Sequence, residues 1–493
     1  MKKLVAILLL LAMICSYFVS CKKDKNQKDN TVGGDTQNAV SLGEGVLPDA
    51  KAEYVDRQFN ILYRDSYKYE WEFNEADAGA HINDAIYKRN TAVEDRYQIE
   101  LVYYPVVSNV VNAFDDNFMA PIQTAVLTNE NAYQLAAGYE YQLAYNSVLG
   151  NFLDWYQVPN VDMDGDWWDR NFAEAATYQN QVYIMTGSLS LSHLYSSSCV
   201  FFNEDLVNSR IDNGSAELFG KVESGEWTLE TFETYVKMFT LDDDGIEGMT
   251  EDDSYGFATN DSTAVDAFVL CSNIAISGRD SEGNIKLYNV NEKLINLAST
   301  LNRIMHTSGD TYVQDGRVEA LDHHIGMMMR GKTAFTTSHL ERAVKLRTTE
   351  VNYGILPYPK YDENQKNYYS VTMDFSTAFT IPKTESGDLD FVGTITEALA
   401  FYSYHYVRDA LYNTVLKFRD AKDANSSKCV DIILENPKYD FATIYAFAWG
   451  DVQGPSMLLR NCLRSKTDAI SVLFDSLKDG YNTKLGVFLN HFE

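Results

Sequence analysis

The sequence predicts an α/β fold built from largely parallel sheets and divided into two lobes. Three observations carry this prediction: short apolar runs spaced along the chain, amphipathic helical stretches between them, and a length of 493 residues. Strands that alternate with helices favour parallel sheets covered by helices. A chain of this length exceeds what one hydrophobic core usually organises, so we expect two lobes.

The strands are predicted from apolar runs that are short enough to be buried strands rather than helices. These runs are FNILY (59–63), IELVYY (99–104), YQLAAGY (133–139), CVFFN (199–203), YGILPY (353–358) and AFTIP (378–382).

Two stretches show helical periodicity. Residues 81–97 place apolar side chains on one stripe and charged side chains outside it. Residues 228–239 begin with Thr228, which we expect to cap the helix N-terminus. Trp227 precedes the cap and is expected to pack on Phe232 as a hydrophobic staple.

The N-terminus has the layout of an export signal. Two lysines precede an apolar run over residues 4–19, which is shorter than the about 20 residues of a membrane span. The run ends in Phe-Val-Ser-Cys, which resembles the lipobox of bacterial lipoproteins. The resemblance implies a signal peptide over 1–20 and a lipid on Cys21. A plain signal peptide with an accidental cysteine is the alternative.

The residues after Cys21 form a polar segment. Residues 21–48 are rich in Lys, Asp, Asn, Gln, Gly and Ser, and such a composition predicts a disordered tether. A lipid-anchored chain would then sit on the outer face of the cell membrane, on the extracellular side.

The net charge excludes some classes of partner, and the cysteine spacing leaves the question of a disulfide open. The formal net charge of −29 disfavours nucleic acid and anionic headgroups as partners. Four widely spaced cysteines follow Cys21, and both a single disulfide and buried free thiols fit their spacing. They are Cys199, Cys271, Cys429 and Cys462.

Nine segments, in a characteristic order, carry a resemblance to a known family. They are INDAIYKRNTAVEDRYQIEL (82–101), DGDWWDRN (164–171), CVFFNEDLV (199–207), GEWTLETFETYVKMFTLDDDG (225–245), DSYGFAT (253–259), RGKTAF (330–335), VNYGILPYPKYDENQKNYYS (351–370), AFTIPKT (378–384) and YDFATIYAFAWG (439–450). Together they resemble the family 1 extracellular solute-binding proteins of bacterial ABC importers, the group that is similar to the maltose-binding protein.

The resemblance implies a periplasmic-binding-protein-like fold of type II, with two lobes joined by crossing hinge strands. Lobe 1 is expected over 49–195 plus 355–378, and lobe 2 over 200–350 plus 385–493. It also implies a monomeric binding protein that is no enzyme and holds no cofactor. Its ligand would be a small polar solute such as a sugar or oligosaccharide, and its partners the permease subunits of the importer.

Candidate ligand contacts follow from the rule that ligands bind at the carboxyl ends of strands in α/β sheets. Sugar binding calls for carboxylates that bridge hydroxyls and for aromatic rings that stack on sugar faces. Applying the strand-end rule gives a list that contains this mixture of residues: Arg64, Asp65, Trp71, Tyr139, Glu140, Ser338, His339, Asp374, Tyr445 and Trp449.

Three further motifs are interpreted as structural. Trp167 and Trp168 are expected to pack a loop against lobe 1. The stretch 240–252 resembles a degraded calcium loop in which Asp242, Asp244 and Glu251 take ligand positions, and we expect no metal there. The adjacent His323 and His324 cannot both face one site on a regular element.

Two other functions compete with solute binding. A surface glycan hydrolase needs two carboxylates, and an acidic chain offers many. A glycan-binding adhesin is disfavoured by the lack of sequence repeats. No GxSxG, HExxH, P-loop or GxGxxG motif occurs in its required context.

Overall fold

The computed structural model describes residues 43–65, 80–108, 116–315, 323–373, 375–384, 388–416, 424–450 and 454–492. Residues 45–493 form one compact unit, and the following description concerns this unit. The predicted signal peptide, Cys21 and almost all of the tether lie outside the described residues. Among the helices in the described ranges, none is both long and apolar enough to cross a membrane.

The first sheet has four strands in the order β11-β3-β1-β2. Strand β1 runs parallel to β2 and β3, whereas β11 runs antiparallel to β3. The apolar runs that predicted these strands are confirmed, with bounds that shift by at most two residues. The strands are β1 (Gln58–Arg64), β2 (Glu100–Val106), β3 (Leu135–Tyr139) and β11 (Thr377–Thr380).

The second sheet has five strands in the order β10-β4-β9-β5-β8. Strand β5 is parallel to β8 and β9, but β4 is antiparallel to both β9 and β10. The α/β class is confirmed, whereas the sheets are mixed rather than largely parallel. The strands are β4 (Ser198–Asn203), β5 (Tyr255–Asn260), β8 (Thr311–Gln314), β9 (Thr333–His339) and β10 (Tyr353–Leu356).

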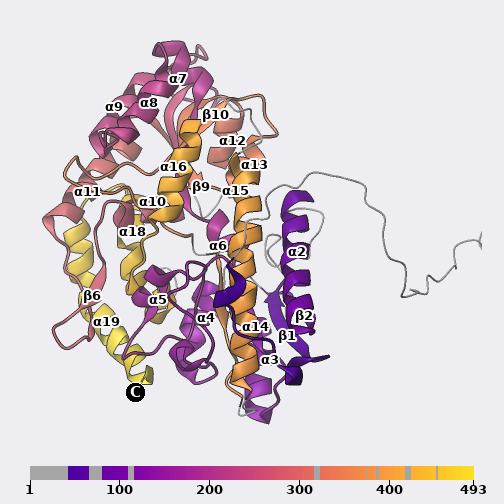
Figure 1. Ribbon diagram of the computed structural model, residues 1–493. Coiled ribbons are helices and arrows are strands. Elements are labelled where there is room, and N and C mark those ends of the chain that lie inside the picture. The colour runs from indigo at the N-terminus through magenta and orange to yellow at the C-terminus, as the bar shows by residue number, and fades with distance from the viewer. Residues whose placement is uncertain are drawn as a thin grey trace, which may run out of the picture. The chain divides into compact units, whose positions relative to one another are not determined.

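Helices pack around both sheets (Figure 1). They are α2 (Ala80–Tyr97), α3 (Asp116–Thr128), α4 (Glu140–Asn146), α5 (Arg170–Ala176), α6 (Leu191–Tyr195), α7 (Glu204–Arg210), α8 (Gly214–Glu223), α9 (Leu229–Phe239), α10 (Thr263–Cys271), α11 (Glu292–Asn302), α12 (His323–Met329), α13 (Arg342–Leu346), α14 (Leu389–Tyr402), α15 (Asp409–Leu416), α16 (Ala424–Glu435), α17 (Phe441–Ile444), α18 (Leu458–Arg464) and α19 (Ile470–Leu489). Two π-helical stretches are η5 (Arg303–Thr307) and η6 (Ser403–Arg408), and a hairpin joins β6 (Ser277–Arg279) to β7 (Ile285–Leu287).

The start of α9 confirms its predicted cap. The hydroxyl of Thr228 accepts a hydrogen bond from the Thr231 backbone N–H at 3.3 Å. The rings of Trp227 and Phe232 meet edge to face, 5.7 Å apart, as a hydrophobic staple requires. The local sequence therefore determined this helix start.

The adjacent tryptophans clamp one buried carboxylate. The indole N–H groups of Trp167 and Trp168 each donate to Glu397 of α14 at 2.9 Å. Burial raises the pKa of Glu397 to about 7, although these two donors act in the opposite direction. The pair thus packs its loop against α14, a helix in the stretch that the sequence assigned to lobe 2. That the pair packs its loop against lobe 1 stays a prediction.

Helix α14 also packs beside the first sheet. The ring of Phe391 lies 5.8 Å from that of Phe59 on β1 and 5.1 Å from that of Tyr54. This helix belongs to the stretch 385–493 that the sequence assigned to lobe 2. The lobe boundaries stay a prediction.

Candidate functional site

Two segments that lead into different sheets lie side by side. Residue Ser197, just before β4, forms a β-bridge with Thr372, which precedes β11. The backbone N–H of Ser198 donates to Val371 O at 2.9 Å, and that of Met373 donates to Ser196 O at 3.0 Å. The chain therefore crosses between the sheets here on two hydrogen-bonded segments.

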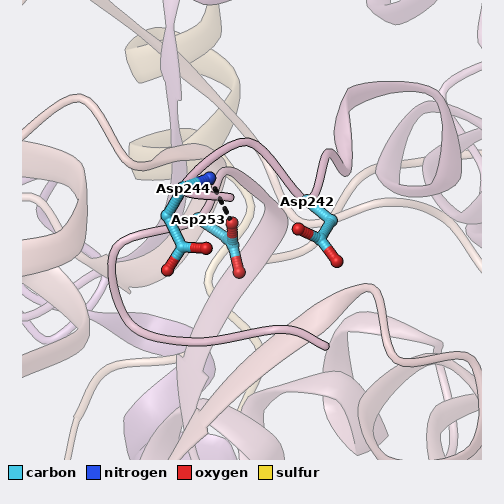
Figure 2. A group of neighbouring side chains, drawn as sticks. All are labelled: Asp242, Asp244 and Asp253. Carbon is cyan, nitrogen blue, oxygen red and sulfur yellow. Dashed lines mark hydrogen bonds between the residues drawn. The ribbon is translucent and has the colours of Figure 1, made fainter. Parts of the chain in front are cut away.

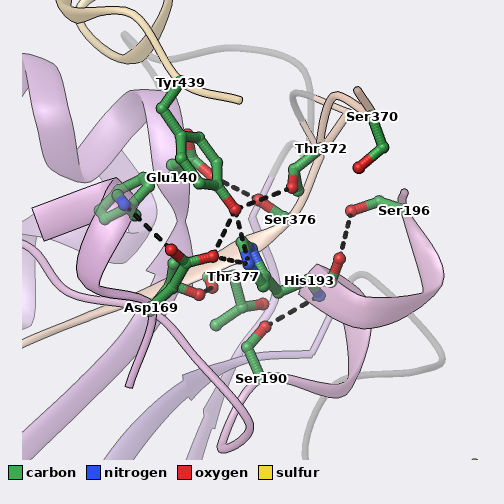
Figure 3. Close-up of polar contacts among 12 residues, drawn as sticks. Glu140, Asp169, Ser190, His193, Ser196, Ser370, Thr372, Ser376, Thr377 and Tyr439 are labelled. Carbon is green, nitrogen blue, oxygen red and sulfur yellow. Dashed lines mark hydrogen bonds and ion pairs between the residues drawn. The ribbon is translucent and has the colours of Figure 1, made fainter. Parts of the chain in front are cut away.

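A polar cluster surrounds these segments, and we call Asp169, His193, Thr372 and Tyr439 the crossing cluster (Figure 3). The Tyr439 hydroxyl donates to Asp169 Oδ2 at 2.6 Å, and His193 Nε2 lies 3.2 Å from the same oxygen. The Thr372 Oγ1 lies 3.3 Å from the Tyr439 hydroxyl. Asp169 also caps α5 by accepting the Phe172 N–H at 3.0 Å.

The electrostatics of the crossing cluster are set by its shared oxygen. Burial opposes ionisation of Asp169, but its hydrogen bonds with His193 and Tyr439 hold the pKa of Asp169 below its ordinary value. Burial, together with the neighbouring Asp169, raises the pKa of Tyr439. At neutral pH the cluster therefore holds an ionised aspartate and a phenol that keeps its proton.

A second group of contacts joins the segment just before β11 to β1 and α4 of the same unit. The buried Arg64 donates to Phe375 O at 2.8 Å and lies 3.5 Å from Thr377 Oγ1. The hydroxyl of Ser376 donates to the buried carboxylate of Glu140. These contacts fix the point where the crossing segment enters the first sheet.

A cavity opens beside Thr372, and we call it the central cavity. The space that it encloses is about 30 Å³, so a solute larger than a few waters enters only when the cavity opens. Tyr141, at the start of α4, reaches it just after β3, and Thr263 reaches it just after β5. The cavity therefore lies at the carboxyl ends of strands from both sheets, where ligands bind in α/β folds.

Helix α10 forms one wall of the central cavity. Thr263, Asp266, Ala267 and Leu270 line it, and their spacing places them on one helical face. Asp266 forms an ion pair with Arg460 of α18, which also lines the cavity. A carboxylate and a guanidinium held this way can bridge neighbouring hydroxyl groups of a solute.

Two hydroxyl groups among the lining residues have no hydrogen-bond partner in the described part of the chain. They are Thr443 Oγ1 and Ser456 Oγ, and both oxygens are buried. A buried hydroxyl without a partner is costly. These two positions therefore suit a solute that supplies its own polar groups.

Three of the predicted contacts lie close to the cavity along the chain. Tyr139 and Glu140 directly precede Tyr141, and the Tyr139 ring stacks on the Tyr141 ring at 5.9 Å. Tyr445 follows Thr443 by two residues, but its hydroxyl donates to Ala176 O at 2.8 Å inside a buried aromatic group.

The other predicted contacts are scattered. The buried indole of Trp449 donates to Tyr481 O at 3.0 Å. Ser338 and His339 end β9, and the His339 ring packs against Phe375 at 4.9 Å. Asp65 is exposed.

Arg64 is turned toward the backbone of the crossing segment, as described above. Trp71 and Asp374 lie outside the described residues.

Sequence reasoning missed the residues that line the central cavity. Tyr141 follows β3 by two residues, so the strand-end rule could have found it, whereas Thr443 lies on α17 (Phe441–Ile444), two residues from the predicted contact Tyr445. Asp266 sits on the helix after β5 and could have been found by the same rule. Nothing in the sequence around Arg460 or Ser456 marks them as lining residues.

The acidic loop, residues 240–254, gathers carboxylates elsewhere in the fold (Figure 2). Oxygen atoms of Asp242, Asp244 and Asp253 lie within 4.8 Å of one another, close enough to hold a cation. Glu251, which the sequence placed among the ligands, instead accepts from the Tyr312 hydroxyl at 3.3 Å. Asp253 takes its place in the cluster.

Asp253 has a clear structural role in this loop. Its carboxylate accepts the backbone N–H groups of Asp243 at 2.8 Å, Asp244 at 3.0 Å and Thr250 at 2.7 Å. These bonds lower the pKa of Asp253. The hydrogen bonds to Asp253 account for the short distances between the carboxylates. The expectation that the loop holds no metal stays a prediction.

Solved structures of sugar-binding proteins share this fold. A cyclo/maltodextrin-binding protein in complex with maltotetraose matches with a TM-score of 0.57 and 13% identity, over 88% of this chain and 98% of that one. The maltose/maltodextrin-binding domain MalE of Bdellovibrio bacteriovorus, bound to maltotriose, matches with a TM-score of 0.53 and 11% identity, over 88% and 100%. An ABC substrate-binding protein of Listeria monocytogenes in complex with cycloalternan matches with a TM-score of 0.52 and 11% identity, over 87% and 99%.

These matches show the fold: the chain has the α/β architecture of ABC solute-binding proteins similar to the maltose-binding protein. They agree with the family resemblance drawn from the sequence. No protein-family model matches the chain, and no curated protein matches it.

Proposed function

We propose that this protein is a lipid-anchored extracellular solute-binding protein that captures a small polar solute and delivers it to an ABC importer. The observation that carries the proposal is the central cavity. It lies at strand ends of both sheets and presents an Asp266–Arg460 ion pair beside two hydroxyls, on Thr443 and Ser456, that have no partner among the described residues.

A sugar or oligosaccharide is the solute class that this chemistry favours. Vicinal hydroxyls match a carboxylate–guanidinium pair, and Tyr141 supplies a ring for the apolar face of a sugar. The shared fold supports this class, because the matched proteins were solved with maltotetraose, maltotriose and cycloalternan.

Delivery requires a conformational change and an anchor. Ligand held between the sheets would favour a closed form, which docks on the permease subunits. A lipid on Cys21 and a tether over 21–48 would keep a monomeric protein on the outer face of the membrane. The lobe division drawn from the sequence, with crossings near the crossing cluster, belongs to this proposal.

The ten residues selected from the sequence remain proposed ligand contacts, and the structure supports some of them better than others. Tyr139 and Glu140 are the best supported, because they adjoin Tyr141. Tyr445 and Trp449 already donate to backbone carbonyls in the core, so we expect them to support the site from behind.

The hydrolase alternative fits the central cavity poorly. Glycosidases use two carboxyl groups about 5 to 9.5 Å apart across the scissile bond. Asp266 is the one carboxylate among the described lining residues, and it is paired with Arg460, so these residues supply no second carboxyl group. Binding without turnover is therefore the better reading.

The decisive experiment combines a ligand screen with hydroxyl-deleting variants. Purified protein is screened by thermal shift against mono- and oligosaccharides, and hits are titrated calorimetrically. Thr443→Val and Ser456→Ala should each weaken binding by about fivefold or more, because each removes a hydrogen bond to the ligand. Their melting temperatures without ligand should hardly change, since neither hydroxyl bonds to a described protein group.

The matched control is Thr483→Val on the exposed face of α19, which should leave affinity unchanged. Unchanged affinity in both cavity variants would remove the central cavity from the site. Release of shorter sugars during incubation would replace solute binding with hydrolysis.

A further inference from the structure

An open groove lies along helix α9, and we call it the α9 groove. The space inside it is about 700 Å³, which is within the range of sites that hold small molecules. The α9 groove and the central cavity share no lining residue. An inference drawn from this groove therefore stands apart from the proposed function.

One face of α9 contributes much of the lining. Thr231, Thr234, Tyr235 and Met238 line the groove, and their spacing of three or four positions places them on the same helical face. Met238 is 44% exposed, so this face offers apolar surface as well as hydroxyl groups.

Helix α8 and the loop 361–364 complete the lining of the groove. Two backbone hydrogen bonds hold the start of this loop against the start of α9. The Leu229 N–H donates to Lys360 O at 2.8 Å, and the Lys360 N–H donates to Trp227 O at 3.0 Å. The groove is therefore bounded by segments that are fixed to one another.

Carboxylates outnumber cations in the lining of the groove. Glu217, Glu230, Asp362 and Glu363 line it, and none of them forms an ion pair with a described residue. Lys221 also lines the groove, but its ammonium is already paired with a glutamate outside the lining, Glu226, at 2.6 Å.

The other carboxylates of α8 and α9 have cationic partners. Glu233 lies 2.6 Å from Arg303 and 2.7 Å from Lys237, and Glu223 lies 2.6 Å from Lys428. Neither Glu233 nor Glu223 lines the groove. On these two helices, the glutamates left without a cation are therefore the ones that line the groove.

We propose that the α9 groove binds a linear polyamine, a flexible molecule whose ammonium groups are joined by hydrocarbon chains. Glu217, Glu230 and Glu363 accept hydrogen bonds from the ammonium groups and supply the opposite charge. The hydrocarbon chain lies on Met238 while the charged groups stay in water. A neutral sugar leaves the charge of these carboxylates uncompensated, so the ligand class differs from that of the central cavity.

The first test is a calorimetric titration of the purified protein with spermidine at low ionic strength, where exposed charges are screened least. The double variant Glu230→Gln, Glu363→Gln should weaken binding by about threefold or more. The matched control is Glu130→Gln, Glu174→Gln, which removes the same charge at exposed positions outside the groove and should leave the affinity unchanged.

A second variant fills the groove without changing its charge. Thr234→Trp places a large ring on the α9 face and should abolish spermidine binding. Thr483→Trp on α19 is the matched control and should retain binding. Both threonines are exposed, and each donates to the carbonyl four residues earlier, Thr234 at 2.9 Å and Thr483 at 2.8 Å.

Three results would overturn the proposal. They are an absence of spermidine binding, equal weakening by the two double variants, and binding that survives Thr234→Trp, since the last two would reflect only the overall acidity of the chain. Trilysine amide is titrated alongside, and tighter binding of this peptide than of spermidine would overturn the choice of a free polyamine. No variant alters a residue that lines the central cavity, so each of these failures leaves the proposed function standing.

Discussion

The crossing cluster and the acidic loop both depend on one aspartate, yet their partners come from very different distances along the chain. In the acidic loop, Asp253 binds the N–H groups of residues 243, 244 and 250, all within ten positions of it. In the crossing cluster, Asp169 binds Tyr439, which lies 270 positions away. The first arrangement is local, whereas the second exists only when distant segments are assembled.

This difference predicts how each region responds to damage. A local loop can lose its aspartate and rearrange, because its ends stay anchored by neighbouring elements. Asp169 joins α5, α6 and the segment before α17. Replacing it leaves its buried partners without a hydrogen-bond acceptor. The same reasoning ranks the following predictions from the largest expected effect to the smallest.

Asp169→Ala should lower the free energy of unfolding by about 3 to 5 kcal/mol, because it leaves His193 and Tyr439 buried without their shared acceptor and removes the α5 cap. Chemical denaturation measures the change. Asp169→Asn keeps an oxygen for the Phe172 N–H and should lose less. A loss for Asp169→Ala below that of a surface substitution would show that the crossing cluster contributes little to stability.

Glu397 offers a buried carboxylate with the opposite pH response. Its pKa is raised from an ordinary value of 4.5 to about 7 in the folded protein, so the folded state holds the proton more tightly than the unfolded state. This contribution to stability is full below about pH 4.5 and is lost as the pH rises toward 7, by about 3 kcal/mol in total. Unfolding measured across this range should show the decline, and Glu397→Gln should flatten it.

The pKa of Asp169, in contrast, is lowered, so its contribution is present above pH 3.8 and is lost only as the pH falls further. Comparing the acid limbs of Glu397→Gln and Asp169→Asn separates the two carboxylates. Identical pH profiles in both variants would contradict the assignment of opposite shifts.

Asp253→Ala should have the smallest effect. We expect it to lower the free energy of unfolding by less than half as much as Asp169→Ala, because its partners are backbone N–H groups that can hydrogen-bond to water instead. Melting temperatures measured with and without millimolar calcium provide the test. Asp242→Ala is the matched control, because its carboxylate accepts one backbone N–H, from Gly248 at 3.2 Å. If calcium raises the melting temperature of the wild type but of neither variant, the acidic loop is a cation site.

The sequence predicted the parts of the fold that depend on neighbours in the chain. The run FNILY became β1 and CVFFN became β4, because a short apolar stretch is buried wherever a sheet forms. Thr228 became a cap because its hydroxyl lies within reach of the Thr231 backbone N–H, three residues later in the chain. The mixed pairing of the sheets was not predicted, since strand direction depends on the connections and not on the strands themselves.

The candidate site shows the same division at the level of single residues. The strand-end rule led to Tyr139 and Glu140, beside the cavity residue Tyr141. It also selected Trp449, which follows α17 rather than a strand and whose buried indole is bonded to Tyr481 O, because an aromatic residue looks the same in sequence whether it faces a ligand or the core. Arg460 was not selected, since its role arises only from Asp266, 194 positions away.

The sequence by itself determined the α/β class, the positions of most strands, the start of α9 and the resemblance to solute-binding proteins. The strands and the helix start depend on residue patterns over fewer than about twenty positions, and the class and the resemblance depend on the order of such patterns along the chain. Only the tertiary structure decided which polar side chains meet at the crossing segments and which of them line the central cavity. Those features depend on contacts between segments far apart in the chain, and no local pattern of residues encodes such a contact.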